Sequence, residues 1–319
     1  MWFEELCGFS EDGTDVRSQI TVDGEYLVSA PNGRRMRWGR FEMASLAALR
    51  ERSIAIGPAT AVREVTSSIG RLHTGRSGAG ATFQVASQFN MLEMVGPGVT
   101  PEDGIDGYEH DPTQGPACAI ACGAGTIYRN YFVPIGDQLG QTADRQLNGL
   151  ADVADLLGVE IPMRNGYAEP SSEQLAIIAG QLRRLDDPGI DRIRGALRVG
   201  VQWDTEVTQR NAGHTVTQVF CSALPVSYFS PSPAEWEPFA RLVLEAAYEA
   251  TLLVAAENAA HTGNHTVYVT MLGGGAFGND KAWIVAAIER AIKVAGSGLD
   301  IAIVSYRRSE PAIAHLLTG

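Results

Sequence analysis

The feature that most constrains the fold lies near the C-terminus, where an apolar, strand-like run leads through a glycine-rich turn into an amphipathic helix. The run and the turn read V-Y-V-T-M-L-G-G-G-A-F-G at 267–278, and the helical pattern follows at 281–294. This order places several backbone N–H groups and a helix N-terminus around one concavity, which suits a phosphate or a pyrophosphate. The sequence therefore predicts an α/β fold with an anion-binding turn.

Two well-known nucleotide-binding motifs do not account for this turn. Its glycines match G-x-G-x-x-G, but the next strand carries Asp300 at its start and ends in Ser305 and Tyr306, without the acidic residue that would bind a ribose. A P-loop is excluded because Asn279 stands where that motif has lysine. The alternative is a turn that only permits close packing of strand and helix. Phe277 favours a ligand site, because a large apolar residue between glycines could cover a ribose.

The rest of the chain shows strand and helix patterns that point to the same fold class. Strands are expected at 82–87, 197–203, 215–224, from Val267, and at 301–306, and helices at 43–51, 116–133, 143–157, 173–185, 236–260 and 281–294. Several strands are nearly continuous apolar runs, as in strands that are buried on both faces. Because helix and strand alternate in the last third, we expect a mostly parallel sheet with helices on both faces.

The N-terminal part has a different pattern. Short alternating runs at 11–40 are broken by Asp-Gly and Asn-Gly pairs, which predicts hairpins, and residues 69–81 are expected to form a glycine-interrupted loop. The chain of 319 residues has no internal repeat and no clear linker. We therefore expect one elaborated domain over 1–319, with 1–80 as a hairpin and helix extension packed on it.

Composition excludes several classes of function. The net charge of -12, without a cluster of Lys and Arg, argues against nucleic acid as a partner. No apolar stretch is long enough to span a membrane and the N-terminus is not a signal peptide, so a cytoplasmic protein is expected. Cys118 and Cys122 have no further Cys or His at zinc-ligand spacing. They are interpreted as small buried hydrophobic residues, and no metal site and no cofactor are predicted.

A second group of polar residues follows the strand at 82–87. Gln88, Asn90 and Glu93 leave the end of a buried strand, where ligands bind in open α/β sheets. The long loop at 96–115 comes next, and loops of that length are commonly functional. It carries Glu102, Asp103, Asp106, Glu109 and Asp111. The alternative is that these acidic residues only form a solvated loop, as most such residues do.

Several of these segments together resemble one known family. They read A-S-Q-F-N-M-L-E at 86–93, T-P-E-D-G-I at 100–105, D-P-T-Q-G-P-A-C-A at 111–119, T-I-Y-R-N-Y-F at 126–132 and V-T-Q-V-F-C-S-A-L-P-V-S-Y at 216–228. With the helix at 236–251 and the turn M-L-G-G-G-A-F-G-N, they resemble the MavL-type branch of the macrodomain superfamily, from about residue 80 onward. The resemblance implies a three-layer α/β/α fold with a mixed, mostly parallel sheet.

The resemblance also implies roles for individual residues. It makes the glycine turn the second phosphate loop, with Phe277 against the distal ribose, and assigns catalysis to Asp103 and Asp111. A third catalytic acid would fall at 116–122, where this chain has no carboxylate. The chain also lacks the Asn-Ala-Ala-Asn signature of common macrodomains and the paired glutamates of poly(ADP-ribose) glycohydrolases. The implied ligand-binding residues are Gln88, Asn90, Gln114, Gly273, Gly274, Gly275, Ala276, Phe277, Gly278 and Asn279.

The function expected from these residues is binding of ADP-ribose and its hydrolysis from modified protein side chains, with arginine as the candidate linkage. The partners would then be ADP-ribose and an ADP-ribosylated protein. A carboxylate near the anomeric carbon can stabilise developing positive charge and orient water. Glu93 is the reserve catalytic candidate, and its alternative role is to cap the adjacent loop. The alternative function is an inactive module that only binds ADP-ribose or a related nucleotide.

Overall fold

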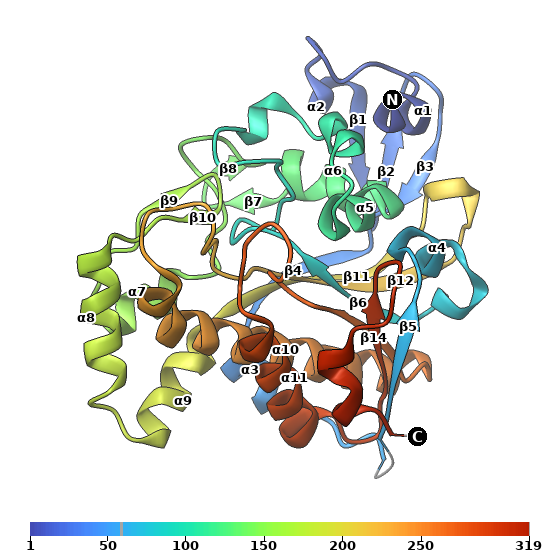
Figure 1. Ribbon diagram of the computed structural model, residues 1–319. Coiled ribbons are helices and arrows are strands. Elements are labelled where there is room, and N and C mark those ends of the chain that lie inside the picture. The colour runs from blue at the N-terminus through green and yellow to red at the C-terminus, as the bar shows by residue number, and fades with distance from the viewer. Residues whose placement is uncertain (58–59, 319) are drawn as a thin grey trace.

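The core of the protein is a seven-stranded mixed sheet, seen edge-on near the centre of the computed structural model, which describes residues 1–57 and 60–318 (Figure 1). The strand order is β4-β11-β12-β6-β13-β14-β5. The five strands from β12 to β5 are parallel, and β11 and β4 are antiparallel to their neighbours. The strands are β4 Arg40–Ser45, β5 Ala61–Thr66, β6 Thr82–Ala86, β11 Arg198–Glu206, β12 Thr215–Cys221, β13 Thr266–Thr270 and β14 Asp300–Ser305. The predicted α/β class with a mixed, mostly parallel sheet is confirmed.

Helices cover both faces of this sheet, so the fold has three layers (Figure 1). Strand β13 shows the cause, because its side chains alternate between two cores. Val267 and Val269 pack towards the long helix α10, whereas Tyr268 packs with Phe83 on the other face. One layer holds α3 Leu46–Glu51, α7 Ala151–Leu157, α8 Ser172–Leu182, α9 Asp187–Ala196, α10 Pro233–Thr262 and α11 Lys281–Ala295, and the other holds α4 Ile69–Thr74, α5 Gln114–Ala121 and α6 Gly123–Tyr131.

The N-terminal residues form a small additional layer beside α6. The predicted hairpins at 11–40 are present as an antiparallel three-stranded sheet. Phe3, Leu27 and Met36 from this layer share a second hydrophobic core with Ile127 of α6. The elements are α1 Trp2–Cys7, α2 Val16–Gln19, β1 Ile20–Asp23, β2 Tyr26–Ser29 and β3 Arg35–Arg37. Residues 40–66 then supply β4 and β5, which are the two edge strands of the main sheet.

Two predicted helices were wrong in their extent because tertiary contacts interrupt them. The helix expected at 43–51 begins at Leu46, since Met43 pairs with Gly200 of β11 and the Ser45 hydroxyl accepts the N-cap bond from Ala48 N. The helix expected at 116–133 is two helices, α5 and α6, separated at Cys122. The N–H of Gly123 donates to Thr208 Oγ1 at 3.0 Å instead of continuing α5.

Other segments also differ from expectation. In the helix expected at 143–157, the first residues form a loop held by a bond from Gly149 N to Phe89 O at 2.8 Å, and only α7 is helical. The loop expected at 69–81 contains helix α4, and α9 and β5 lie where no element was expected. The remaining short elements are β7 Pro134–Ile135, β8 Gln138–Leu139, β9 Met163–Arg164, β10 Tyr167–Ala168, η1 Arg76–Gly78, η2 Pro101–Asp103, η3 Asp106–His110, η4 Gln209–Asn211 and η5 Pro311–Leu316.

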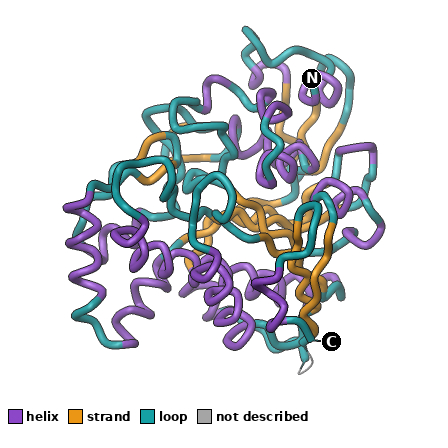
Figure 2. Tube along the Cα trace, in the orientation of Figure 1, coloured by secondary structure: helices purple, strands orange, loops and turns teal. Residues whose placement is uncertain are grey.

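The arrangement leaves one end of the sheet open to loops. Figure 2 shows the long loops gathered above the strands, while most of the helices lie below them. Within residues 1–57 and 60–318, no helix combines the length and the apolar character needed to cross a bilayer. The four cysteines are free and buried, as expected for Cys118 and Cys122.

Candidate functional site

A cavity of about 480 Å³ lies at the carboxyl ends of the parallel strands. Strands β6 and β13 pair only at Thr82↔Val267 and Phe83↔Tyr268, so they part towards these ends. The cavity opens where they part, and the ends of both strands line it. Open α/β sheets bind ligands at this kind of edge. The cavity is therefore the candidate site.

Gln114 ties one side of the cavity to the sheet. Its Oε1 accepts from Ala86 N and its Nε2 donates to Gln84 O, both at 2.8 Å. These contacts satisfy the edge of β6 that no longer pairs with β13. Gly115 allows α5 to approach this closely, because a Cβ there would lie 1.9 Å from Ala86 O. Gln114, expected as a ligand-binding residue, lines the cavity but uses its amide to position α5.

The glycine turn forms the opposite wall. Gly278 has a φ of +69°, and a Cβ there would lie 1.6 Å from Ser227 Oγ. The fold therefore requires glycine at this position. Asn279 closes the turn, since its N–H donates to Gly273 O at 3.0 Å and its Nδ2 to Leu224 O at 2.8 Å. A further bond, from Ser227 N to Phe277 O at 3.0 Å, holds the turn near its tip.

The tip of the turn presents free donors to the cavity. Among the described residues, the N–H groups of Gly273, Gly275, Ala276 and Phe277 have no hydrogen-bond acceptor. These four residues line the cavity, and Gly275 and Ala276 are exposed. The unpaired N–H groups of Gly275, Ala276 and Phe277 are consecutive in the chain. The turn therefore offers unpaired backbone donors on residues that line the cavity.

Two tyrosines that were not predicted as site residues complete this wall. Tyr167 and Tyr228 each lie 5.5 Å from Phe277 between ring centroids, and all three residues line the cavity. Tyr167 follows Asn165 and Gly166, a two-residue turn with φ of 47° and 79° between β9 and β10. The Asn-Gly pair is a hairpin signal that could have located Tyr167. It could not have shown that the hairpin reaches this cavity.

The acidic loop contributes one carboxylate to the cavity. Asp111 is half-buried and lines it, and its Oδ1 accepts from Thr113 N at 2.8 Å. The other four acids of the loop bind backbone N–H groups elsewhere. Glu102 accepts from Ala143, Asp103 from Thr100, Asp106 from Phe3 and Glu109 from Trp2. The loop is therefore not merely a solvated loop, and Asp111 is the acid in it that lines the cavity.

Glu93 supplies a second carboxyl group on the same side. Its side chain is fully buried, and Oε2 lies 3.4 Å from Arg129 Nη2. Arg129 is equally buried, donates from Nε to Met91 O at 2.9 Å and lies 3.6 Å from the centroid of Phe220. Burial raises the pKa of Glu93 to about 7, although the charge of Arg129 opposes the change. Burial thus favours the neutral carboxylic acid, and the charge of Arg129 favours the carboxylate.

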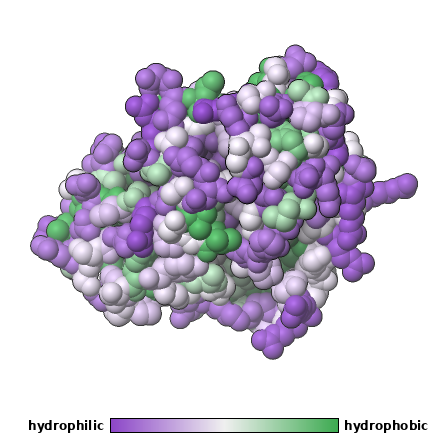
Figure 3. All heavy atoms as spheres, turned by 90° about the horizontal axis from the view of Figure 1, so that it is seen from above, coloured by the Kyte–Doolittle hydropathy of each residue, from purple (hydrophilic) through white to green (hydrophobic). Residues whose placement is uncertain are grey.

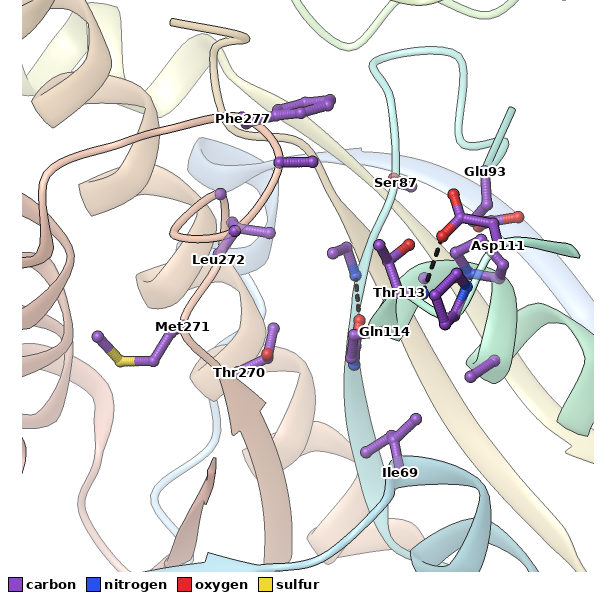
Figure 4. Close-up of a pocket in the computed structure, with 18 of the residues that line it drawn as sticks. Ile69, Ser87, Glu93, Asp111, Thr113, Gln114, Thr270, Met271, Leu272 and Phe277 are labelled. Carbon is purple, nitrogen blue, oxygen red and sulfur yellow. Dashed lines mark hydrogen bonds between the residues drawn. The ribbon is translucent and has the colours of Figure 1, made fainter. Parts of the chain in front are cut away.

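Asp111 and Glu93 lie on the side of the cavity opposite the glycine turn. Figure 4 shows Thr270, Met271, Leu272 and Phe277 on one side, and Ser87, Glu93, Asp111, Thr113 and Gln114 on the other. From above, Figure 3 shows a largely hydrophilic surface with a few apolar groups near its middle. Burial first, and the charge of Asp111 second, raise the pKa of Tyr228.

Eight of the expected site residues line the cavity and five do not. Those that line it are Gln88, Glu93, Asp111, Gln114, Gly273, Gly275, Ala276 and Phe277. Asn90 is fully buried and donates to Gln146 Oε1 at 2.8 Å, so it does not reach the cavity. Asp103 does not reach it because its carboxylate closes its own turn, with Thr100 N at 2.8 Å. Gly274, Gly278 and Asn279 shape the base of the glycine turn.

Gln88 lines the cavity, but its amide is already engaged. Its Oε1 accepts from Met94 N at 2.9 Å, and its Nε2 donates to Met94 O and to the Tyr167 hydroxyl. Gln88 therefore joins the end of β6 to Tyr167. In the described part of the chain, no three His, Cys, Asp or Glu side chains gather in a way that could hold a metal ion.

Comparisons with known proteins give similarity in fold only. No protein-family model matches the sequence, and no curated protein matches it. The solved structure of poly(ADP-ribose) glycohydrolase from Deinococcus radiodurans in complex with ADP-ribose is 12% identical, with 86% of this chain and 91% of that chain covered and a TM-score of 0.45. The enzyme from Thermomonospora curvata is 15% identical, with 92% of each chain covered and a TM-score of 0.45. At such identities and TM-scores, this similarity carries no conclusion about substrate or activity.

Proposed function

We propose that this protein binds ADP-ribose in the cavity and hydrolyses it from modified protein side chains, with arginine as the linkage. We further propose that it is a macrodomain of the MavL type, which its sequence segments resemble. One observation supports this function above the others. A single cavity joins free N–H groups of the glycine turn and the carboxyl groups of Asp111 and Glu93. The same cavity is lined by the aromatic rings of Tyr167, Tyr228 and Phe277. Its volume of about 480 Å³ lies within the range of small-molecule sites.

In this proposal the two walls bind different parts of the ligand. The free N–H groups from Gly273 to Phe277 hold the pyrophosphate, as backbone N–H groups in turns commonly hold phosphate. Phe277 then covers the distal ribose together with Tyr228. The anomeric carbon faces the opposite wall, where Asp111 lies. An acidic protein with a net charge of -12 needs such backbone donors to hold an anion.

The chemistry assigned to Asp111 is that of a general base. Water attacks the anomeric carbon while the bond to the guanidinium nitrogen breaks, and the bonding electron pair leaves with that nitrogen. The oxygen of water becomes the hydroxyl of ADP-ribose, and Asp111 takes the released proton. That proton then passes to the departing guanidine, which leaves as the guanidinium of arginine. The negative charge of Asp111 also stabilises the positive charge that develops on the sugar.

Glu93 is assigned a supporting role in the proposal. Its carboxyl group is inaccessible and is held by Arg129, so it cannot reach a substrate as freely as Asp111 can. Asp103, the other acidic residue expected to be catalytic, caps a turn outside the cavity lining. We therefore expect Asp111 to carry most of the activity.

The test compares Asp111→Asn with Asp103→Asn on a protein that is ADP-ribosylated on arginine. The wild type should release ADP-ribose, and Asp111→Asn should lower kcat by about a hundredfold or more, as for the loss of a general base. Asp103→Asn is the matched control and should retain the wild-type kcat within about twofold. Equal losses in the two variants would contradict the assignment to Asp111.

The alternative function is a module that binds ADP-ribose without cleaving it. One observation favours it: helix α5 contains no carboxylate, although the resemblance implies a third catalytic acid there. Calorimetric titration of the wild type with ADP-ribose separates the possibilities. Binding without turnover would support the reader module, whereas the absence of binding would refute both functions.

A further inference from the structure

Glu11, in the N-terminal layer, contacts the acidic loop from a distant part of the sequence. Its Oε2 accepts from Ile105 N at 2.9 Å and from Asp106 N at 2.6 Å, and its Oε1 accepts from the Tyr131 hydroxyl. The residue is only 8% exposed. Gly104 allows this approach, since a Cβ there would lie 2.5 Å from Glu11 Oε2. A buried carboxylate with three donors is a fixed anchor, because burial without them would be unfavourable.

The same loop also holds the start of helix α1. Trp2 N donates to Glu109 Oε2 at 3.0 Å, and Phe3 N donates to Asp106 Oδ1 at 3.3 Å. These bonds satisfy two of the free N–H groups at the helix N-terminus. Residues 2–11 thus both accept hydrogen bonds from the start of η3 and donate hydrogen bonds to its carboxylates.

Turn η3 connects this anchor to both carboxyl groups of the cavity. Tyr108 lies within η3 and is buried, and its hydroxyl accepts from Glu93 N at 3.0 Å. Asp111 follows η3 directly, and its N–H donates to Tyr108 O at 3.1 Å. The backbones of Glu93 and Asp111 are thus each one hydrogen bond from the turn that Glu11 holds.

We propose that Glu11 is a positioning residue, which fixes η3 and through it the carboxyl groups of Asp111 and Glu93. The catalytic consequence rests on the proposed function, but the positioning itself does not. Glu11 touches neither the cavity nor the glycine wall. Its loss should therefore change the placement of the acids more than the binding of ADP-ribose.

The test uses Glu11→Ala, Glu11→Gln and the control Asp12→Asn. The amide of Glu11→Gln can still accept from both N–H groups with its oxygen and donate to Tyr131, so this variant should behave as the wild type. Asp12 is the neighbouring exposed carboxylate, and its side chain makes no hydrogen bond within the described residues. Should Glu11→Ala fail to fold, Tyr131→Phe is the substitute, because it removes only the bond from the Tyr131 hydroxyl to Glu11. It should change hydrogen exchange and kcat in the same direction but by less.

Two readouts separate this proposal from the proposed function. Hydrogen exchange at residues 104–111 should be about a hundredfold faster in Glu11→Ala, since two bonds to a charged acceptor are lost. On the ADP-ribosylated substrate, kcat should fall about tenfold while KM and the affinity for ADP-ribose stay within about twofold. Unchanged exchange at 104–111 would overturn the positioning role, even in a protein without hydrolase activity. Faster exchange with unchanged kcat in an active enzyme would also overturn it.

Discussion

The buried carboxyl group of Glu93 should make the stability of this protein fall between acidic and neutral pH. Burial raises the pKa of Glu93 from about 4.5 to about 7 in the folded chain. One pKa unit corresponds to about 1.4 kcal/mol, so ionisation should cost the folded state about 3 kcal/mol more than the unfolded state. The contribution of the neutral acid is fully present below about pH 4.5 and is lost as the pH rises towards 7.

The assay is urea unfolding of the wild type and of Glu93→Gln at several pH values between 4.5 and 7.5. The wild type should lose about 3 kcal/mol of unfolding free energy over this range relative to Glu93→Gln, because the amide does not titrate. Glu5→Gln is the control, since Glu5 is exposed and has no side-chain hydrogen bond among the described residues. Equal pH slopes for the wild type and Glu93→Gln would refute the reasoning, because Glu93 would then titrate at the same pH in both states.

Two further predictions test the walls of the cavity. Gly278→Ala should weaken ADP-ribose binding about tenfold in calorimetry, because its Cβ would collide with Ser227 Oγ and displace the turn. Gly263→Ala, at a similar φ of +73° but with no atom within 4 Å of the new Cβ, should leave binding unchanged, and weaker binding there would contradict the argument. Arg129→Met should lower the unfolding free energy at pH 7.5 by about 3–5 kcal/mol in urea, since Glu93 is left buried without its partner. The double variant Arg129→Met with Glu93→Gln should recover part of this loss, and no recovery would show that the pair is not coupled.

Much of the fold could be predicted because its signals are local. Strand β6 and the antiparallel hairpins were located from apolar runs and from Asp-Gly and Asn-Gly pairs. The errors fall where distant residues decide the backbone. Gly123 ends the run of helix because its N–H binds Thr208, and Met43 is a strand residue because it faces Gly200. Neither partner is visible in a window of neighbouring residues.

The candidate site was predictable as two walls but not in its details. The polar end of β6 and the glycine turn were both identified, and the cavity joins them. The role of each acid could not be predicted, because Asp103 and Asp111 look alike in the sequence. Only their hydrogen bonds separate them, since Asp103 caps its own turn whereas Asp111 lines the cavity.

The sequence by itself determined the α/β class and the glycine turn as an anion-binding candidate, because periodicity and turn chemistry depend on neighbouring residues. The tertiary structure alone decided which side chains meet. It brought Tyr167 against Phe277, buried Glu93 beside Arg129, and set Glu11 on the loop that leads to Asp111. The physical reason is that side-chain environment, and with it the pKa and orientation of each group, arises from contacts between residues far apart in the chain.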